Sequence, residues 1–216
     1  MINKDLFKLF KKPDSEESNF PLGKNILIAG LGNPGKQYAG NRHNVGFMTV
    51  DHIINKLNFS GKKIKSKSVV VEGRYNNIRI IFSKPQTFMN LSGDAIVSLM
   101  KFYKIQTNQV LVVHDDIDLP FGVIRLRPSG GAGGQKGLSS IINRLGTKEF
   151  ARLRVGVGRP PGNMDPADYV LKDFIKTERE ELPFILDSVY KMVITYLDSG
   201  LETAMNLYNG TVTKEE

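Results

Sequence analysis

Three separate segments of the chain carry residues whose types suit hydrolysis by an activated water molecule. Asn33 and His43 lie in the first segment, Asn90 lies in the second, and Asp115 lies in the third. A carboxylate that accepts the N–H of an imidazole fixes its tautomer, so the other ring nitrogen can take a proton from water. Asparagine amides can donate to a developing oxyanion. A histidine such as His43 at one strand end and an aspartate, Asp115 or Asp116, at another could therefore form a general base and its partner, if the fold brings them together.

Each of these segments also has a structural interpretation that needs no chemistry. A single histidine is often a surface or capping group, and Asp115 and Asp116 could cap a turn. Asn33 precedes a proline, as is common in turns, and Phe88 and Met89 could belong to the core.

Gly30, Gly32 and Gly35 have the G-x-G-x-x-G spacing of a dinucleotide-binding loop and follow an apolar run. Such a site needs a helix directly after the loop and an acid at the end of the next strand, about 20 residues on. Here a polar segment separates the loop from a helical pattern that begins near Val45, and Asp51 falls within that pattern. The loop therefore indicates a chemistry other than that of a nicotinamide or flavin enzyme.

Hydrophobic periodicity predicts the elements that must position these residues. The expected strands lie at 25–29, 68–73, 78–85, 110–116, 123–128 and 152–158. The expected helices lie at 50–57, 96–103, 138–145 and 185–197. The second and third strands can form a hairpin around Asn76–Asn77. The last helix starts either at a Thr177–Glu180 capping box, with Pro183 inside, or at Pro183 itself.

Strands alternate with helices along the chain, which predicts a single α/β domain with a twisted, mostly parallel (mixed) sheet flanked by helices. Residues 1–24 are expected to be a flexible N-terminal extension, residues 25–210 the domain, and residues 211–216 a tail. In open α/β sheets, ligands bind outside the carboxyl ends of the strands, which is where the polar segments lie.

Composition excludes several classes of site. The 216 residues contain no cysteine, so disulfides, thiolate nucleophiles and cysteine metal sites are excluded. The three histidines do not form a convincing ligand set, because His52 falls within a helix, and we expect no metal. No apolar run approaches the roughly 20 residues of a membrane span, and the first residues lack a signal-peptide core. We expect a cytoplasmic protein without membrane contact.

The formal net charge of +8 is concentrated in one part of the chain. Residues 121–160 contain one acid, Glu149, and eight basic residues: Arg125, Arg127, Lys136, Arg144, Lys148, Arg152, Arg154 and Arg159. This stretch is either an ordinary basic surface or a patch for a polyanion such as nucleic acid.

Four long segments are informative as a set: GLGNPGKQYAGNRHNVGF, KPQTFMNLSG, VHDDIDLPFGVIRLRPSGGAGGQKGLSSII and FARLRVGVGRP. In this order, and over nearly all of residues 25–200, they resemble the bacterial-type peptidyl-tRNA hydrolase family. The resemblance implies an enzyme that hydrolyses the ester joining a peptide to the terminal ribose of tRNA, which recycles the tRNA. It implies neither a metal nor a cofactor, and we expect a monomer.

The resemblance also implies roles for individual residues. His43 matches the family's general base, Asp115 the aspartate that orients it, and Asn33 an asparagine that helps select peptidyl over aminoacyl ends. The substrate site would further include Tyr38, Phe88, Met89 and Asn90, the last holding the peptide backbone and the attacking water. The tRNA acceptor stem and its phosphates would meet Arg125, Arg127, Lys136, Arg152, Arg154 and Arg159.

One loop departs from the family pattern. Where the family usually has G-H-G-G-H-N-G, residues 131–137 read G-A-G-G-Q-K-G, so Ala132 and Gln135 replace histidines and Lys136 replaces asparagine. Lys136 would exchange an amide contact for a cationic one, which favours phosphate or ribose contact over peptide placement.

The altered loop leaves two alternatives to weigh. One is a non-catalytic relative, similar to chloroplast splicing factors of this family that bind RNA and a protein partner. The intact His43, Asp115, Asn33 and Asn90 argue against it. The other is a nucleotide-dependent oxidoreductase, which needs a ribose-binding acid that the sequence does not place.

Overall fold

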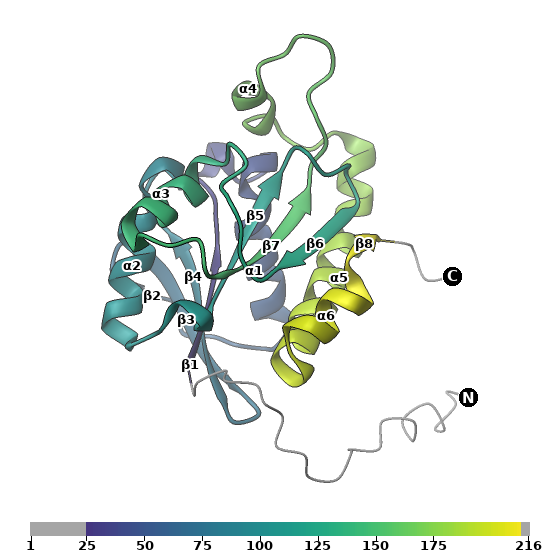
Figure 1. Cartoon of the computed structure of the whole chain (residues 1–216). Coiled ribbons are helices and arrows are strands. Elements are labelled where there is room, and N and C mark those ends of the chain that lie inside the picture. The colour runs from purple at the N-terminus through teal and green to yellow at the C-terminus, as the bar shows by residue number, and fades with distance from the viewer. Residues whose placement is uncertain (1–24, 213–216) are drawn as a thin grey trace, which may run out of the picture.

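The structure is a computed structural model that describes residues 25–212. Within these residues, one sheet of eight strands runs through the molecule in the order β2-β3-β4-β1-β5-β7-β6-β8 (Figure 1). The strands are β1 (Asn25–Gly30), β2 (Lys63–Lys65), β3 (Ser68–Tyr75), β4 (Ile78–Pro85), β5 (Val110–Asp116), β6 (Val123–Arg127), β7 (Ala151–Gly156) and β8 (Gly210–Thr211).

The four central strands, β4, β1, β5 and β7, are parallel, and the pairs on both sides of them are antiparallel. Helices cover both faces of the centre, so its strands are apolar on both sides, and Ile26, Leu27 and Ile28 of β1 are fully buried. The hairpin of β3 and β4 turns at Asn76, which has a positive φ of 50°. The predicted mixed sheet is confirmed, with its parallel strands in the centre.

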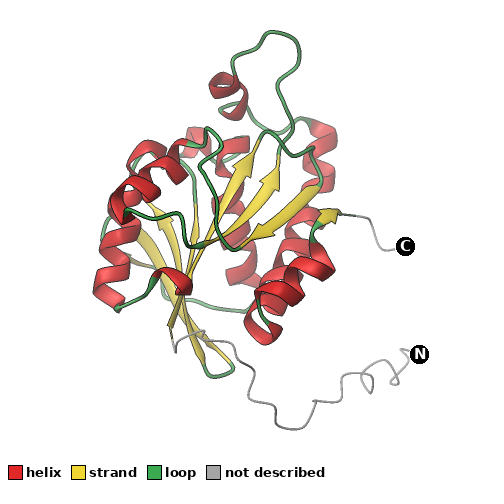
Figure 2. Ribbon diagram, in the orientation of Figure 1, coloured by secondary structure: helices red, strands yellow, loops and turns green. Residues whose placement is uncertain are grey.

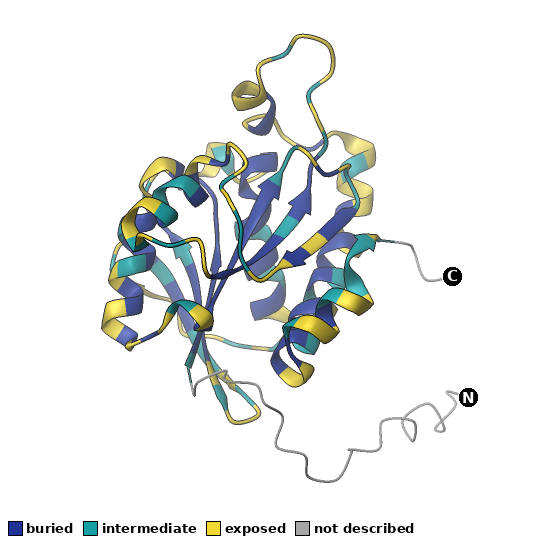
Figure 3. Ribbon diagram, in the orientation of Figure 1, coloured by how far each residue is buried: buried dark blue, intermediate teal, exposed yellow. Residues whose placement is uncertain are grey.

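Helices form a layer on each face of the sheet (Figure 2). One face carries α2 (Ser92–Tyr103) and α3 (Lys136–Leu145), and the other carries α1 (Val45–Lys56), α5 (Lys176–Ser199) and α6 (Leu201–Tyr208). Each layer packs an apolar stripe on the strands, so the central strands are buried and the outer helix faces are exposed (Figure 3).

Shorter helices lie in the loops around the sheet. Helix α4 (Pro166–Val170) stands on a loop that projects beyond the strands at the top of Figure 1. Single turns of 3-10 helix are η2 (Lys36–Tyr38), η3 (Arg42–Asn44), η4 (Met89–Leu91) and η5 (Thr107–Gln109).

Two glycines allow the start of α1 to touch the strands directly. A Cβ atom on Gly46 would lie 2.5 Å from the backbone oxygen of Val113, and a Cβ atom on Gly30 would collide with the backbone of Gly46. The first glycine of the G-x-G-x-x-G spacing therefore serves the packing of a helix on strands. Asp51, the acid at the distance of a ribose ligand, lies in α1 and pairs with Lys84 at 2.6 Å.

The last long helix begins earlier than either predicted start. The Glu178 carboxylate accepts the backbone N–H of Ile175 at 2.8 Å, and α5 begins at Lys176. Pro183 therefore lies inside the helix, as the first of the two predicted starts implies. The Thr177–Glu180 capping box of that prediction is not the cap of α5.

The carboxyl end of the described chain joins the sheet. Thr211 of β8 pairs with Val123, and the N–H of Val212 donates to the carbonyl of Gly122 at 2.8 Å. The first residues of the expected tail are thus part of the fold. The expected extension over 1–24 and the end of the tail, 213–216, lie outside the described residues. Among residues 25–212, no helix is both long and apolar enough to span a membrane.

Candidate active site

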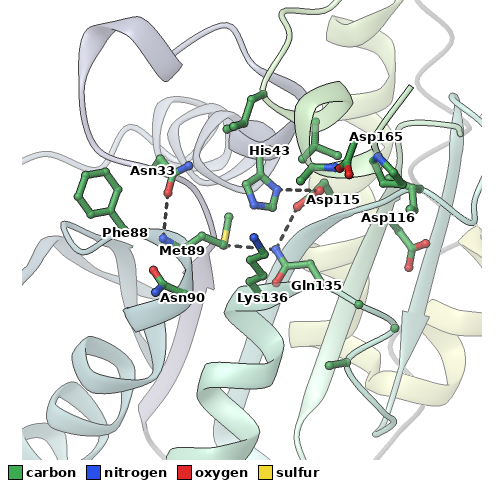
Figure 4. A pocket seen from close by; sticks show the side chains of 18 of the residues that line it. Asn33, His43, Phe88, Met89, Asn90, Asp115, Asp116, Gln135, Lys136 and Asp165 are labelled. Carbon is green, nitrogen blue, oxygen red and sulfur yellow. Dashed lines mark hydrogen bonds and ion pairs between the residues drawn. The ribbon is translucent and has the colours of Figure 1, made fainter. Parts of the chain in front are cut away.

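His43 and Asp115 meet at the carboxyl edge of the parallel strands. Nδ1 of His43 lies 2.9 Å from Oδ2 of Asp115, and the two residues are 9% and 4% exposed. Asp115 is near the end of β5, and His43 lies in η3, beyond the loop that follows the neighbouring strand β1. The structure therefore forms the pair that the sequence suggested (Figure 4).

The hydrogen bond to Asp115 sets the tautomer of His43. An ionised carboxylate only accepts, so Nδ1 carries the proton and Nε2 of the neutral ring has a free lone pair. His43 lines a pocket, and no group within residues 25–212 forms a hydrogen bond with its Nε2. That nitrogen can therefore take a proton from water in the pocket.

Arg42 fixes the short helix that carries His43. Its buried guanidinium donates to the backbone carbonyl of Asp173 at 2.8 Å and forms an ion pair with Glu178 at 2.7 Å. It also lies over the ring of Tyr169, 4.4 Å from the centroid. Nothing in the sequence signals this role, because an arginine in a polar loop is usually a surface charge.

Asn33 and Asn44 tie the glycine loop to its neighbours. Asn44 accepts the backbone N–H of Asn33 at 2.9 Å and donates to its carbonyl at 3.0 Å. The side-chain oxygen of Asn33 accepts the backbone N–H of Met89 at 2.9 Å. The amide nitrogen of Asn33 is therefore the group left for the pocket, where it can donate to a carbonyl oxygen or an oxyanion.

The pocket beside the pair has a volume of about 910 Å³. Eight of the thirteen predicted site residues line it: Asn33, Tyr38, His43, Phe88, Met89, Asn90, Asp115 and Lys136. Phe88 is 58% exposed at its edge, whereas Met89 is buried and belongs to both the pocket wall and the core. The exposed Lys136 points into the pocket from the first turn of α3 (Figure 4).

Helix α4 supplies another wall of the pocket. Asp165 caps this helix, since its Oδ1 accepts the N–H of Ala167 at 2.7 Å, and Val170 and Leu171 line the pocket at the other end. With Phe88, these two residues give the pocket an apolar part next to its amides and carboxylates. Such a mixture suits a peptide, which has polar backbone groups and varied side chains.

Gln135 is a residue to which the sequence assigned no role. Its Nε2 donates to Oδ1 of Asp115 at 3.1 Å and to Sδ of Met89 at 3.3 Å, and its Oε1 accepts the N–H of Leu138 at 2.8 Å. Glutamine is not among the preferred N-cap residues, so its cap was not recognisable. The only signal was that the loop departs from the family pattern here.

Three of the five predicted arginines, all of them outside the pocket, are exposed or half-buried on adjacent strands. Arg125 and Arg127 are exposed on β6, and Arg125 is in register with Arg154 on β7. Nε of Arg154 donates to Oδ2 of Asp116 at 2.5 Å, and Asp116 lines the pocket. Arg159 is also exposed and has an acid as its partner. A basic surface therefore begins at the edge of the pocket.

The expectation that Arg152 contacts tRNA is wrong. This residue is 2% exposed, and its guanidinium donates to the backbone carbonyls of Gly131 at 3.0 Å and Lys148 at 2.8 Å. Arg152 instead holds the glycine-rich loop that precedes α3. On a strand with alternating basic residues, periodicity alone does not distinguish a buried guanidinium from an exposed one.

The other two histidines are engaged elsewhere. His52 on α1 pairs with Asp187 at 2.6 Å, and His114 donates from Nδ1 to the backbone carbonyl of Asp115 at 2.7 Å. Burial lowers the pKa of His114, so its ring is neutral at physiological pH. Among the described residues, no three His, Cys, Asp or Glu side chains gather as a metal-ligand set.

Comparisons with known proteins agree on one family. The family model for peptidyl-tRNA hydrolase matches residues 27–216. A peptidyl-tRNA hydrolase of Frankia casuarinae is 48% identical over 183 residues, which are 85% of this chain and 93% of the relative. A chloroplastic peptidyl-tRNA hydrolase of Arabidopsis thaliana is 45% identical over 205 residues, covering 94% and 71%. The crystal structure of peptidyl-tRNA hydrolase from Acinetobacter baumannii is similar with a TM-score of 0.82 and 32% identity, covering 88% and 96%.

Proposed function

The chain belongs to the peptidyl-tRNA hydrolase family, and on that basis we propose that His43 is the general base of its reaction. The protein is a hydrolase that cleaves the ester between peptide and tRNA and so recycles the tRNA. The observation that carries the proposed role is the buried hydrogen bond between His43 and Asp115 at the wall of the pocket. It leaves one imidazole nitrogen facing the place where substrate would lie.

In the proposed reaction, Nε2 of His43 takes a proton from water while the water oxygen attacks the ester carbonyl carbon. The imidazolium that forms is stabilised by the Asp115 carboxylate. The bond from the carbonyl carbon to the ribose oxygen then breaks, and the proton on Nε2 passes to that oxygen. General-base catalysis of this kind contributes roughly 10²–10⁴-fold, so positioning and electrostatics supply the rest.

Asn33 and Asn90 are the proposed amide contacts to the reacting peptide. The nitrogen of Asn33 is oriented toward the pocket by the bond between its oxygen and Met89, so it can donate to the oxyanion. Asn90 also lines the pocket and can hold the peptide backbone or the attacking water. Tyr38 and Phe88, at the pocket wall, are proposed to contact the rest of the peptide.

Arg125, Arg127 and Arg154 are proposed to contact the acceptor stem, with Lys136 nearer the 3′ end. The three arginines lie on neighbouring strands beside the pocket, and Lys136 points into it. Contacts to phosphates position an RNA without reading its sequence, which suits an enzyme that must accept many tRNAs.

The test is release of N-acetyl-amino acid from N-acetyl-aminoacyl-tRNA by the purified protein, with and without a chelator. Wild-type protein is expected to be active in both conditions. His43→Ala should lose roughly 10²–10⁴-fold in kcat and still bind tRNA. His52→Ala, which changes a histidine on α1, is the matched control and should keep full activity. Full activity of His43→Ala, or loss of its tRNA binding, would contradict the proposed role.

Two further expectations are kept as predictions: the protein acts as a monomer, and it acts in the cytoplasm. Light scattering after size-exclusion chromatography tests the first. Microscopy of the tagged full-length chain in its own host tests the second. The relatives include a chloroplastic protein, so an organelle is the alternative outcome.

A further inference from the structure

The side-chain amide of Gln135 makes three hydrogen-bond contacts next to the His43–Asp115 pair. Its amide nitrogen lies 3.1 Å from Oδ1 of Asp115, and its amide oxygen lies 2.8 Å from the backbone nitrogen of Leu138. The residue is 8% exposed, and its nitrogen also contacts Sδ of Met89 at 3.3 Å. Figure 4 shows the amide between Met89 and Asp115, bonded to the carboxylate oxygen that does not meet His43.

The orientation of this amide is determined by its neighbours. The N–H of Leu138 is a donor, so it requires the amide oxygen, and the Asp115 carboxylate is an acceptor, so it requires the amide nitrogen. A flipped amide would place two oxygens together at one end and two donors together at the other. Gln135 therefore presents a donor to Asp115 and cannot exchange it for an acceptor without breaking the cap of α3.

We propose that Gln135 is a positioning residue that orients Asp115 for its action on His43, an inference that rests on the proposed function. Among residues 25–212, each carboxylate oxygen of Asp115 has one donor: Nδ1 of His43 on Oδ2 and Nε2 of Gln135 on Oδ1. Two donors fix the plane of a carboxylate that is 4% exposed and has little access to water. The plane of the carboxylate in turn fixes the ring of His43.

Gln135 donates to Asp115 without bringing a titratable group to it. A primary amide is uncharged at physiological pH, whereas a free imidazole gains a proton near pH ~6.5. The family usually has histidine at this place. In this chain the donor to Oδ1 of Asp115 is therefore an amide that carries no charge.

The test is Gln135→Glu, measured as kcat, KM and their pH profiles. Glutamate keeps an oxygen for the N–H of Leu138 but puts another oxygen against Asp115. We expect kcat to fall roughly 10- to 100-fold, as for loss of a hydrogen bond to a charged group, with KM for the tRNA substrate nearly unchanged. A second variant, Gln135→Met, removes the donor without adding a carboxyl group that could share a proton with Asp115, and it should lower kcat by a similar factor. Gln135→His returns a ring N–H and should stay closer to wild type.

Gln109 provides a matched control. It is also 8% exposed and also uses both ends of its amide, donating to the carbonyl of Asn25 and accepting the N–H of Gln106, both at 2.8 Å. It is the last residue of η5, directly before β5, whereas the pocket lies at the other end of that strand. Gln109→Glu should therefore lower the melting temperature and leave kcat and its pH profile unchanged.

Two outcomes would overturn the inference: a wild-type kcat in folded Gln135→Met, or equal effects of Gln135→Glu and Gln109→Glu on kcat. A measurement that does not depend on enzymatic activity distinguishes failure of this inference from failure of the proposed function. The Nδ1 proton of His43, which is hydrogen-bonded to Asp115, should change its chemical shift in nuclear magnetic resonance spectra of Gln135→Met relative to wild type. If this chemical shift is unchanged, Gln135 does not act through Asp115, whatever reaction the protein catalyses.

Discussion

Arg154 on β7 and Asp116 on β5 form an ion pair with 2.5 Å between Nε and Oδ2, at the border between the basic surface and the pocket. The carboxylate engages only Nε, and the terminal nitrogens of Arg154 have no hydrogen-bond partner among the described residues. A guanidinium has five N–H groups, so this one can be held by Asp116 and still donate to a phosphate.

Arg154→Ala is expected to raise KM for the tRNA substrate and to leave kcat within about twofold, because a phosphate contact positions substrate without touching the ester. The slope of log KM against log salt concentration should become smaller by about one. Arg74→Ala on β3, which changes an exposed arginine away from the pocket, is the control and should change neither quantity. A fall in kcat with constant KM would contradict the phosphate contact.

Lys136→Asn restores the residue that the family usually has in this loop. Loss of the cation should raise KM and weaken its salt dependence, and return of an amide should raise kcat by improving placement of the peptide. Kinetics with N-acetyl-aminoacyl-tRNA and with a longer peptidyl-tRNA measure both effects. The amide contact is excluded if kcat falls for both substrates.

Gly46→Ala is expected to lower the free energy of unfolding by about 1–3 kcal/mol, as overpacking does, because its Cβ atom would lie 2.5 Å from the carbonyl oxygen of Val113. Activity should fall as well, because α1 follows directly after the helix turn that carries His43. Urea unfolding measures the first effect and ester hydrolysis the second. Gly131→Ala is the control, since nothing lies within 4 Å of its Cβ position. Equal stability of the two variants would refute the packing argument.

His114 should make the stability of the fold sensitive to mild acid. Burial lowers its pKa, with Arg152 acting in the same direction and Asp115 and Asp116 acting against it. Below about pH 6.5 the unfolded chain takes up a proton there that the folded chain does not bind, so stability falls by up to about 1.4 kcal/mol per pH unit. Above that pH the effect vanishes.

The measurement is urea unfolding of wild type and His114→Gln between pH 5 and pH 8. The difference in unfolding free energy between the two proteins should depend on pH only below about pH 6.5, where the wild type loses stability faster. Parallel curves would show that His114 does not titrate differently in the folded and unfolded states.

The sequence alone predicts the strands and helices in which apolar residues are continuous or recur at a regular spacing. Apolar runs such as that of β5 and the three- and four-residue spacing in α1 each predict one kind of element. Strand β2 and strand β8 were missed, because they have three and two residues and no alternation long enough to recognise. The start of α5 was missed because the residue before it, Ile175, has no capping side chain.

For the site, sequence located the residues that line the pocket and missed the ones that support them. Arg42, Gln135 and Arg152 are polar residues in loops or on a basic strand, where exposure is the usual expectation. Their burial is set by tertiary contacts with segments far along the chain, such as the bond from Arg42 to Asp173. Spacing in the sequence carries no information about such contacts.

The close approach of α1 to the strands ties two kinds of mutation together. A side chain at Gly30 or Gly46 would push α1 away from the strands. His43 lies in the turn directly before α1, so its imidazole would move with the helix. These two positions do not line the pocket, yet they have no room for a side chain. The contact between α1 and the strands both stabilises the fold and places His43. A substitution at this contact that changes stability is therefore expected to change hydrolysis as well.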